Sequence, residues 1–132
     1  MTRYADRTKV PVIQTRSEIE TLLVKYGADQ FVYANAPDRA VIGFTMQDRQ
    51  VRFYLPLGTL KPQQARQRWR ALLLVIKAKL ESIESGIEEF EEAFLGQIIL
   101  PDGKQVAEWA KPQLEAAYKS GKMPALLPGP TP

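Results

Sequence analysis

The chain has 132 residues, of which 45% are hydrophobic and 25% are charged, and its formal net charge is +3. This length and composition are typical of one globular domain with a hydrophobic core, and they exclude a disordered or fibrous chain. The sequence contains no cysteine and no histidine, which excludes disulfides, Cys-His or Ser-His-Asp catalysis and the usual zinc sites. We therefore expect a protein that is not an enzyme and binds no cofactor or metal.

The sequence also predicts where the protein resides. Residues 1–9 contain no apolar run of the kind found in secretory signals. No stretch approaches the roughly 18 to 20 apolar residues that a membrane-spanning helix needs. Since the absence of cysteine suits a reducing compartment, we expect a cytoplasmic protein with no membrane partner.

Residues 1–16 are predicted to form a basic arm, which Pro11 keeps extended. The arm has one acid, Asp6, against four basic residues, Arg3, Arg7, Lys9 and Arg16. The single domain is then expected over residues 17–122.

A capping box opens the domain, because Ser17 is followed three residues later by Glu20. Apolar residues at helical spacing then predict a helix over residues 18–26 that ends at Gly27. These apolar residues are Ile19, Leu22, Leu23 and Tyr26.

Three β-rich runs follow. Residues 31–33 and 41–46 flank a cluster of turn-forming residues and predict two paired strands. After a polar turn, Arg52 and Tyr54 alternate with the apolar residues Val51, Phe53 and Leu55. This period of two is typical of a strand with one buried face, so we predict a three-stranded antiparallel meander.

The longest predicted helix follows the meander. Pro62 suits the first position of a helix, and no glycine or proline interrupts the chain from Gln63 until Gly86. One broad apolar stripe on this helix contains Trp69, which we expect in the core. The stripe consists of Ala65, Trp69, Leu72, Leu73, Ile76, Leu80 and Ile83. The fold class predicted is therefore α+β, in the order α-β-β-β-α, with the meander packed on this long central helix.

The last third of the chain is predicted to be helical. One helix is expected over residues 87–96, and another over residues 106–118 with a break or a fresh start at Pro112. Trp109 lies in this second pattern and suits either the core or an interface. The Pro-rich tail over residues 123–132 is expected to be extended, with Leu126 and Leu127 placed to dock on the body.

Charge is distributed unevenly along the chain. Residues 61–80 contain six basic side chains and no acid, and residues 81–95 contain six acids and no base. Because this order opposes the preference of a helix dipole, local helix stability does not explain it. We hypothesise a phosphate-binding surface formed by Arg3, Arg7, Lys9, Lys61, Arg66, Arg68, Arg70, Lys77 and Lys79.

On a helical wheel the helix residues of this surface lie along both flanks of the apolar stripe, and we expect both flanks to be accessible. The alternative is that these charges are solvated, or that they are paired. Pairing within the chain would join Lys77 to Glu81, and pairing between chains would form an antiparallel dimer.

Two further sites follow from the pattern. Arg52 and Tyr54 on an open sheet face suit the stacking of single-stranded bases, although such residues are also ordinary on an antiparallel sheet. The four glutamates over residues 88–92 have the oxygen ligands that a divalent cation prefers. No DxDxDG loop accompanies them, so a solvated acidic face is the favoured interpretation.

Several strings carry a resemblance over nearly the whole chain: Arg3-Tyr-Ala-Asp-Arg-Thr, Tyr26-Gly-Ala, Arg66-Gln-Arg-Trp-Arg-Ala-Leu, Ile76-Lys-Ala-Lys-Leu-Glu, Leu100-Pro-Asp-Gly, Glu108-Trp and Gly121-Lys-Met-Pro-Ala-Leu-Leu-Pro. In these strings the chain resembles small uncharacterised proteins of bacteriophages and prophages. The resemblance implies a mobile-element origin and a role inside a bacterial host cell, and it assigns no activity, ligand or site residue.

The order of elements over residues 17–85 is also similar to that of double-stranded-RNA-binding domains, and its β-β-β-α portion to that of single-strand annealing proteins. The chain departs from the RNA-binding pattern at the start of the long helix, where Lys61 is the one lysine before Arg66. The function that we hypothesise is that of a non-enzymatic phage accessory protein that binds DNA or RNA. The alternative is a protein-interaction module, either a homodimer or a binder of a host protein.

Overall fold

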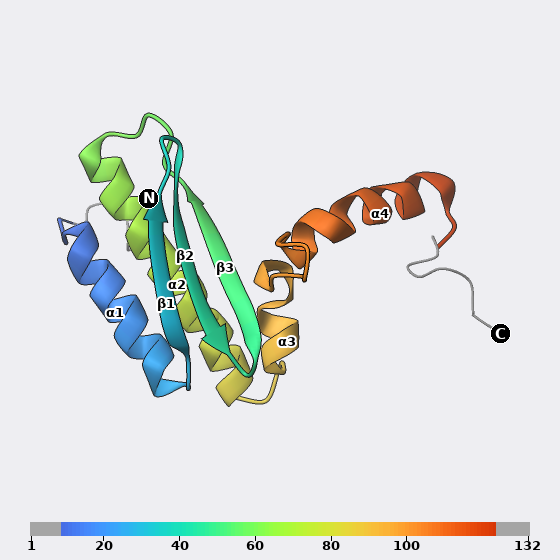
Figure 1. Ribbon diagram of the computed structural model, residues 1–132, viewed down its shortest axis with the longest axis horizontal. Helices are drawn as coiled ribbons and strands as arrows, with labels where there is room; N and C mark the ends of the chain where they lie inside the picture. The colour runs from blue at the N-terminus through green and yellow to red at the C-terminus, as the bar shows by residue number, and fades with distance from the viewer. Residues whose placement is uncertain (1–8, 124–132) are drawn as a thin grey trace.

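The computed structural model describes residues 9–123 (Figure 1). Its elements confirm the predicted α+β class and the α-β-β-β-α order. In chain order they are α1 (Val12–Lys25), β1 (Asp29–Asn35), β2 (Arg39–Met46), β3 (Arg49–Pro56), α2 (Pro62–Glu84), α3 (Phe90–Ala93), the 3-10 turn η1 (Leu95–Gln97) and α4 (Val106–Ser120). In this part of the chain no helix has both the length and the apolar character to cross a membrane.

The sheet is the predicted antiparallel meander, with strand order β1-β2-β3. β2 and β3 pair without interruption from Arg39–Pro56 to Met46–Arg49. The turn that joins them, at Gln47 and Asp48, has positive φ angles of 48° and 61°. Two successive positive φ angles match the right-handed twist of the strands, which makes this a tight two-residue hairpin.

Both α1 and α2 pack on the same face of the sheet (Figure 1). The alternation predicted for β3 holds, because Val51, Phe53 and Leu55 are buried. From α2, Trp69 packs into this core and is 4% exposed, which confirms its predicted place. No helix of residues 9–123 packs on the opposite face of the sheet.

Helix α1 begins earlier than the sequence predicted. It starts at Val12, with Pro11 as its N-cap, rather than at residue 18. A proline costs little at this point, because the first N–H groups of a helix have no partner within it. The Pro11 carbonyl accepts hydrogen bonds from the backbone N–H of Gln14 and Thr15, at 3.1 and 3.2 Å. Residues 12–16 therefore belong to the domain, and the predicted arm is shorter than expected.

The helix expected over residues 87–96 is replaced by the short α3 and by η1. Phe94 is fully buried against Phe44, Phe53 and Phe90, with ring centroids 6.0, 6.2 and 5.5 Å away. Beyond it, the Ile99 N–H donates to the Gln50 carbonyl at 2.8 Å. The chain must bend between these two contacts, so tertiary packing overrides the helical pattern.

Helix α4 runs through Pro112 without the predicted break. Proline removes one helical hydrogen bond, the one to the Glu108 carbonyl. The neighbouring Gln113 side chain donates from Nε2 to the Trp109 carbonyl at 3.1 Å. Among the described elements α4 contacts η1 alone, and it projects from the body of the domain (Figure 1). The predicted tail from residue 124 onward, with Leu126 and Leu127, lies outside the described residues.

Candidate nucleic-acid interface

The basic residues predicted on the long helix do not form one surface. Arg66, Arg70 and Lys77 lie on the flank of α2 that faces α1, whereas Arg68 and Lys79 lie on the flank toward β3 and α3. The expectation that both flanks are accessible is wrong for Arg70, which α1 buries, whereas Arg66 on the same flank is half-buried and Lys77 is exposed. Arg3 and Arg7 lie outside the described residues, and Lys9 is exposed.

Arg70 belongs to the protein interior. Its side chain is 8% exposed, and its guanidinium forms an ion pair with Glu18 of α1. The same nitrogen, Nη1, donates to the Thr15 hydroxyl at 3.4 Å. The prediction of Arg70 as a phosphate contact is therefore corrected, because a cation that is desolvated and paired with a carboxylate has no free face for a polyanion.

Two other helix cations are engaged by backbone carbonyls. The Lys79 ammonium donates to the Ala93 carbonyl at 2.7 Å and so satisfies the C-terminal end of α3. Arg68 Nη1 donates to the Pro56 carbonyl at 2.8 Å, but the residue is exposed. A carbonyl does not neutralise a cation, so Arg68 keeps its charge available at the surface.

The remaining predicted helix residues differ in their surroundings. Arg66 donates from Nη2 to Gln63 Oε1 at 2.7 Å and is half-buried. Lys77 lines the groove between α1 and α2 together with Lys25, and Lys61 is exposed just before α2. In the described part of the chain no ion pair joins Lys77 to Glu81, which was the within-chain pairing considered as an alternative to phosphate binding.

A compact basic cluster lies instead on the open face of the sheet. Arg52 and Tyr54 alternate away from the buried side of β3, as predicted, and Arg52 Nη1 donates to the Tyr54 hydroxyl at 3.2 Å. The guanidinium carbon of Arg39 lies 4.2 Å from the centroid of the Tyr54 ring. The tyrosine thus holds two arginines together, one over its ring and one at its hydroxyl, and we call Arg39, Arg52 and Tyr54 the sheet cluster.

Arg39 was missed by the sequence reasoning, which placed it in a turn. Its contact with Tyr54 depends on the strand register, in which Arg39 pairs with Pro56 and Val41 pairs with Tyr54. Arg39 and Tyr54 are therefore diagonal neighbours, close enough for long side chains to touch. The turn-forming residues before Arg39 predict a hairpin but not its register. The contact between Arg39 and Tyr54 could therefore not be predicted from them.

The charge in the middle of this face is positive. Between the Arg39–Pro56 pair and the Thr45–Gln50 pair the strands turn no carboxylate to the open face, and the exposed Asp29 of β1, which pairs with Thr45, lies at the end of the face away from Arg39. Arg68 lies beside the same corner, because the carbonyl that it binds belongs to Pro56, the partner of Arg39. Two arginines, from β2 and β3, therefore contact one tyrosine, and a third, from α2, binds the end of β3 two residues beyond that tyrosine.

A shallow hollow of about 280 Å³ adjoins the cluster. Its walls include Val32, Val41, Arg52 and Ile99, and its floor passes over Gly43. Val32 is 59% exposed, although it stands in the middle of a strand. The polar side chains of Gln30, Thr45 and Gln50 also line the hollow. A hollow with apolar and polar walls beside a guanidinium suits a flat ring that carries a charged group nearby.

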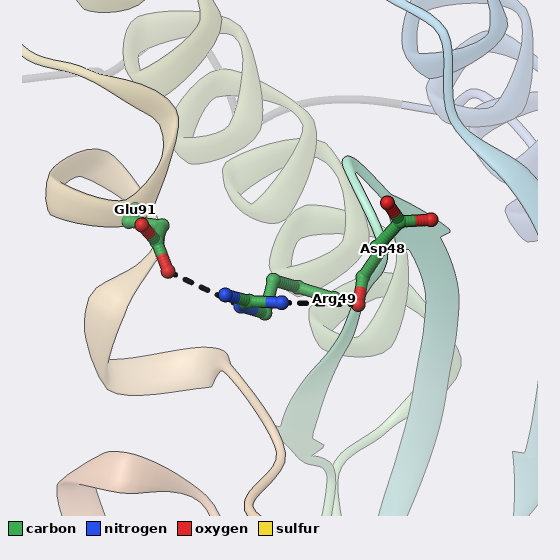
Figure 2. A network of polar contacts seen from close by, with 3 residues as sticks. All are labelled: Asp48, Arg49 and Glu91. Carbon is green, nitrogen blue, oxygen red and sulfur yellow. Dashed lines mark hydrogen bonds and ion pairs between the residues drawn. The ribbon is translucent and has the colours of Figure 1, made fainter.

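The acidic segment forms no metal site in the described residues. Three of its carboxylates each bind a different donor group. Figure 2 shows this for Glu91, whose Oε2 accepts a hydrogen bond from Arg49 Nε at 3.1 Å. Arg49 also donates to the Asp48 carbonyl at 3.4 Å, so the hairpin is tied to α3. Glu88 accepts from the Ser82 hydroxyl at 2.8 Å, and the Glu92 side chain caps the N–H of Glu89.

Comparison of the chain with protein-family models, with curated proteins and with solved structures finds no match.

Proposed function

We propose that this protein is a non-enzymatic phage accessory protein that binds single-stranded nucleic acid on the open face of its sheet. The observation that carries the proposal is the sheet cluster, in which two guanidinium groups contact one half-buried tyrosine, with no strand carboxylate between the Arg39–Pro56 and Thr45–Gln50 pairs. Bases of a single strand stack on guanidinium planes and aromatic rings, and arginines neutralise the phosphates between them. A duplex offers no free base faces for such stacking.

In this proposal the residues have separate roles. The outer plane of the Arg39 guanidinium is a stacking surface, since its inner plane covers the Tyr54 ring. Arg52 contacts the Tyr54 hydroxyl and also lines the hollow, where it serves one phosphate while a base enters the hollow. Arg68 adds a further charge for the backbone at the corner near Pro56. The element order that is similar to that of double-stranded-RNA-binding domains does not support the proposal, because a function depends on a site and not on a fold.

Fluorescence anisotropy with labelled single-stranded and double-stranded oligonucleotides tests this proposal. We expect the single strand to bind more tightly at low salt, and log Kd to change linearly with log salt concentration. The double variant Arg39→Gln/Arg52→Gln should weaken binding about 10-fold to 100-fold, and the salt slope should fall by about 0.7 for each lost phosphate contact. Tyr54→Leu should weaken binding with little change in slope, because it removes the ring that holds the Arg39 stacking surface in place and removes no charge.

The matched control is Lys25→Gln/Lys111→Gln, which removes the same net charge from exposed positions on α1 and α4. This control should keep most of the affinity. The proposal fails if no oligonucleotide binds at low salt, or if the control weakens binding as much as the change in the sheet cluster. If Lys61→Gln/Lys77→Gln abolishes binding and the sheet variants do not, the helix surface is the true site.

A further inference from the structure

A glycine stands in the middle of the open face of the sheet. Gly43 pairs with Val32 of β1 and with Arg52 of β3, so it is the central position of one row across the three strands. The row has no side chain at this position, and Gly43 lines the hollow of about 280 Å³ together with both of its pairing partners. The absence of a side chain from the central strand therefore contributes the space above its backbone.

The backbone does not require a glycine at this position. Gly43 has no positive φ angle. A Cβ at position 43 would meet only ordinary van der Waals neighbours, the nearest being the Val51 carbonyl oxygen at 3.6 Å and the Val32 Cβ at 3.8 Å. Glycine weakens the interior of a strand, and it often marks a position that a ligand approaches closely. Gly43 thus leaves a space open although a side chain would stabilise the strand.

One wall of the hollow is formed by Gln30, whose backbone is strained. Its φ angle of 54° lies in the left-handed region that favours glycine. Gln30 belongs to the irregular part of β1, where the pairing register shifts between Asp29 and Val32. Such a bulge re-aims a side chain, and strained residues cluster at ligand sites. The Gln30 side chain lines the hollow, and its Oε1 accepts a hydrogen bond from the Thr45 hydroxyl at 3.5 Å.

The hollow is polar on one side and apolar on the other. Gln50 pairs with Thr45 across β2 and β3, so its amide lies on the same side of Gly43 as that of Gln30. On the other side of Gly43 along β2, the wall is the apolar Val41. A nucleobase has the same division, because its faces are apolar and its edge carries hydrogen-bond donors and acceptors. Amide side chains bind such edges with both of their polar atoms.

We propose that the hollow is a pocket for a single nucleobase, with Gly43 as its floor and with Gln30 and Gln50 binding the polar edge of the base. Its volume is close to the lower end of the range of small-molecule pockets, about 300–1,000 Å³, which suits one base rather than several. The inference rests on the proposed function, since Arg52 on the same wall binds the phosphate of that nucleotide. It adds that affinity depends on the base inside the pocket as well as on stacking and charge.

The first test fills the hollow. Gly43→Ile adds a branched side chain of the kind that suits a strand, and Gly43→Ala is the matched control, because its Cβ has room. In fluorescence anisotropy, Gly43→Ile should weaken the binding of a single-stranded oligonucleotide about 10-fold. The salt slope should stay unchanged, because no charge is removed. Gly43→Ala should bind nearly as the wild type does, and urea unfolding checks that both variants are folded.

The second test removes the strained side chain. Gln30→Gly leaves a residue that adopts a positive φ without strain, so the free energy of unfolding should not fall. Oligonucleotide binding should nevertheless weaken about 3-fold to 10-fold, because hydrogen bonds to the base are lost. Gln47→Gly is the matched control, since Gln47 has a φ of 48° in the hairpin and does not line the hollow. This control should leave binding unchanged.

The third test separates the base pocket from the proposed function, because it uses a ligand without a strand. Adenosine monophosphate is the probe, since glutamine amides bind the edge of adenine. It should shift the backbone amide NMR signals of Val32, Gly43 and Thr45 in isotope-labelled protein. Ribose phosphate, which carries the phosphate but no base, should not shift them. The shifts should persist in Gly43→Ala and disappear in Gly43→Ile.

The outcomes distinguish the two proposals. If Gly43→Ile binds the oligonucleotide as the wild type does and Arg39→Gln/Arg52→Gln weakens binding, the base pocket is refuted and the proposed function stands. If no oligonucleotide binds but adenosine monophosphate shifts the signals of the hollow, the proposed function fails and the base pocket stands. Equal shifts from ribose phosphate show that the hollow binds phosphate alone and overturn the base pocket, as does the absence of any shift.

Discussion

Removing the carboxylate of Glu18 tests whether Arg70 is part of the interior. Glu18→Gln keeps the size of the side chain but leaves the buried guanidinium beside a neutral amide. Arg70→Met leaves an unbranched apolar side chain in the same space and a carboxylate that water can reach, because Glu18 is 43% exposed and Arg70 is 8% exposed. The two substitutions break the same ion pair but leave different charges behind.

The exposures set the expected magnitudes. Breaking a fully buried ion pair costs about 3–5 kcal/mol, whereas an exposed pair contributes about 0–1 kcal/mol. Since one partner is buried and the other is half-exposed, we expect Glu18→Gln to lower the free energy of unfolding by about 1–3 kcal/mol. Arg70→Met should cost less than about 1 kcal/mol, because the carboxylate that remains is hydrated.

Urea unfolding monitored by tryptophan fluorescence measures both effects, provided that the slope m is unchanged. The double variant Glu18→Gln/Arg70→Met completes a double-mutant cycle and gives the coupling between the two side chains. The oligonucleotide affinity of Arg70→Met should equal that of the wild type. The reasoning is refuted if Arg70→Met destabilises the protein more than Glu18→Gln, or if it reduces oligonucleotide affinity.

Two further predictions concern the core and the alkaline limit of stability. Burial, followed by the hydrogen bond to Glu20, raises the pKa of Tyr33 from 10.0 to about 12, although Arg16 over its ring lowers the pKa in part. The folded state thus disfavours the phenolate, so the stability that Tyr33 contributes is complete below about pH 10 and is lost as the pH rises toward about 12. Tyr33→Phe should reduce this loss, measured as the difference between the urea unfolding midpoints at pH 9 and pH 11. A loss equal to that of the wild type would contradict the prediction. Phe94→Ala should lower the free energy of unfolding by about 3–5 kcal/mol, because Phe94 is fully buried. Leu95→Ala should lower it by less than about 1 kcal/mol, because Leu95 is 52% exposed. Equal shifts in Tm for the two variants would contradict the burial of Phe94 before η1.

Local sequence patterns were sufficient to predict an element wherever the pattern lies within that one helix or strand. The alternation of Val51, Phe53 and Leu55 with polar residues predicted β3, and the uninterrupted apolar stripe around Trp69 predicted α2. Both patterns arise from geometry within one element, a period of two in a strand and of 3.6 in a helix. They do not depend on which other part of the chain packs nearby.

The candidate site was predicted less completely, because its residues depend on contacts between elements. Arg52 and Tyr54 followed from alternation in β3, but Arg39 joins them only through the β2–β3 register. The bend at Phe94 depends on rings from β2 and β3, which lie far from it in sequence. Neither contact leaves a periodic signal near the residue itself.

The sequence by itself determined the order of the elements, the side of each element that is apolar and the total charge. Only the tertiary structure decided which cations reach solvent, since the two flanks of α2 are equivalent until α1 packs beside one of them. Arg70 and Arg68 stand two positions apart in the same basic run, yet one is paired with Glu18 in the interior and the other is exposed beside Pro56. The physical reason is that burial is a property of the assembled layers, whereas periodicity is a property of a single segment.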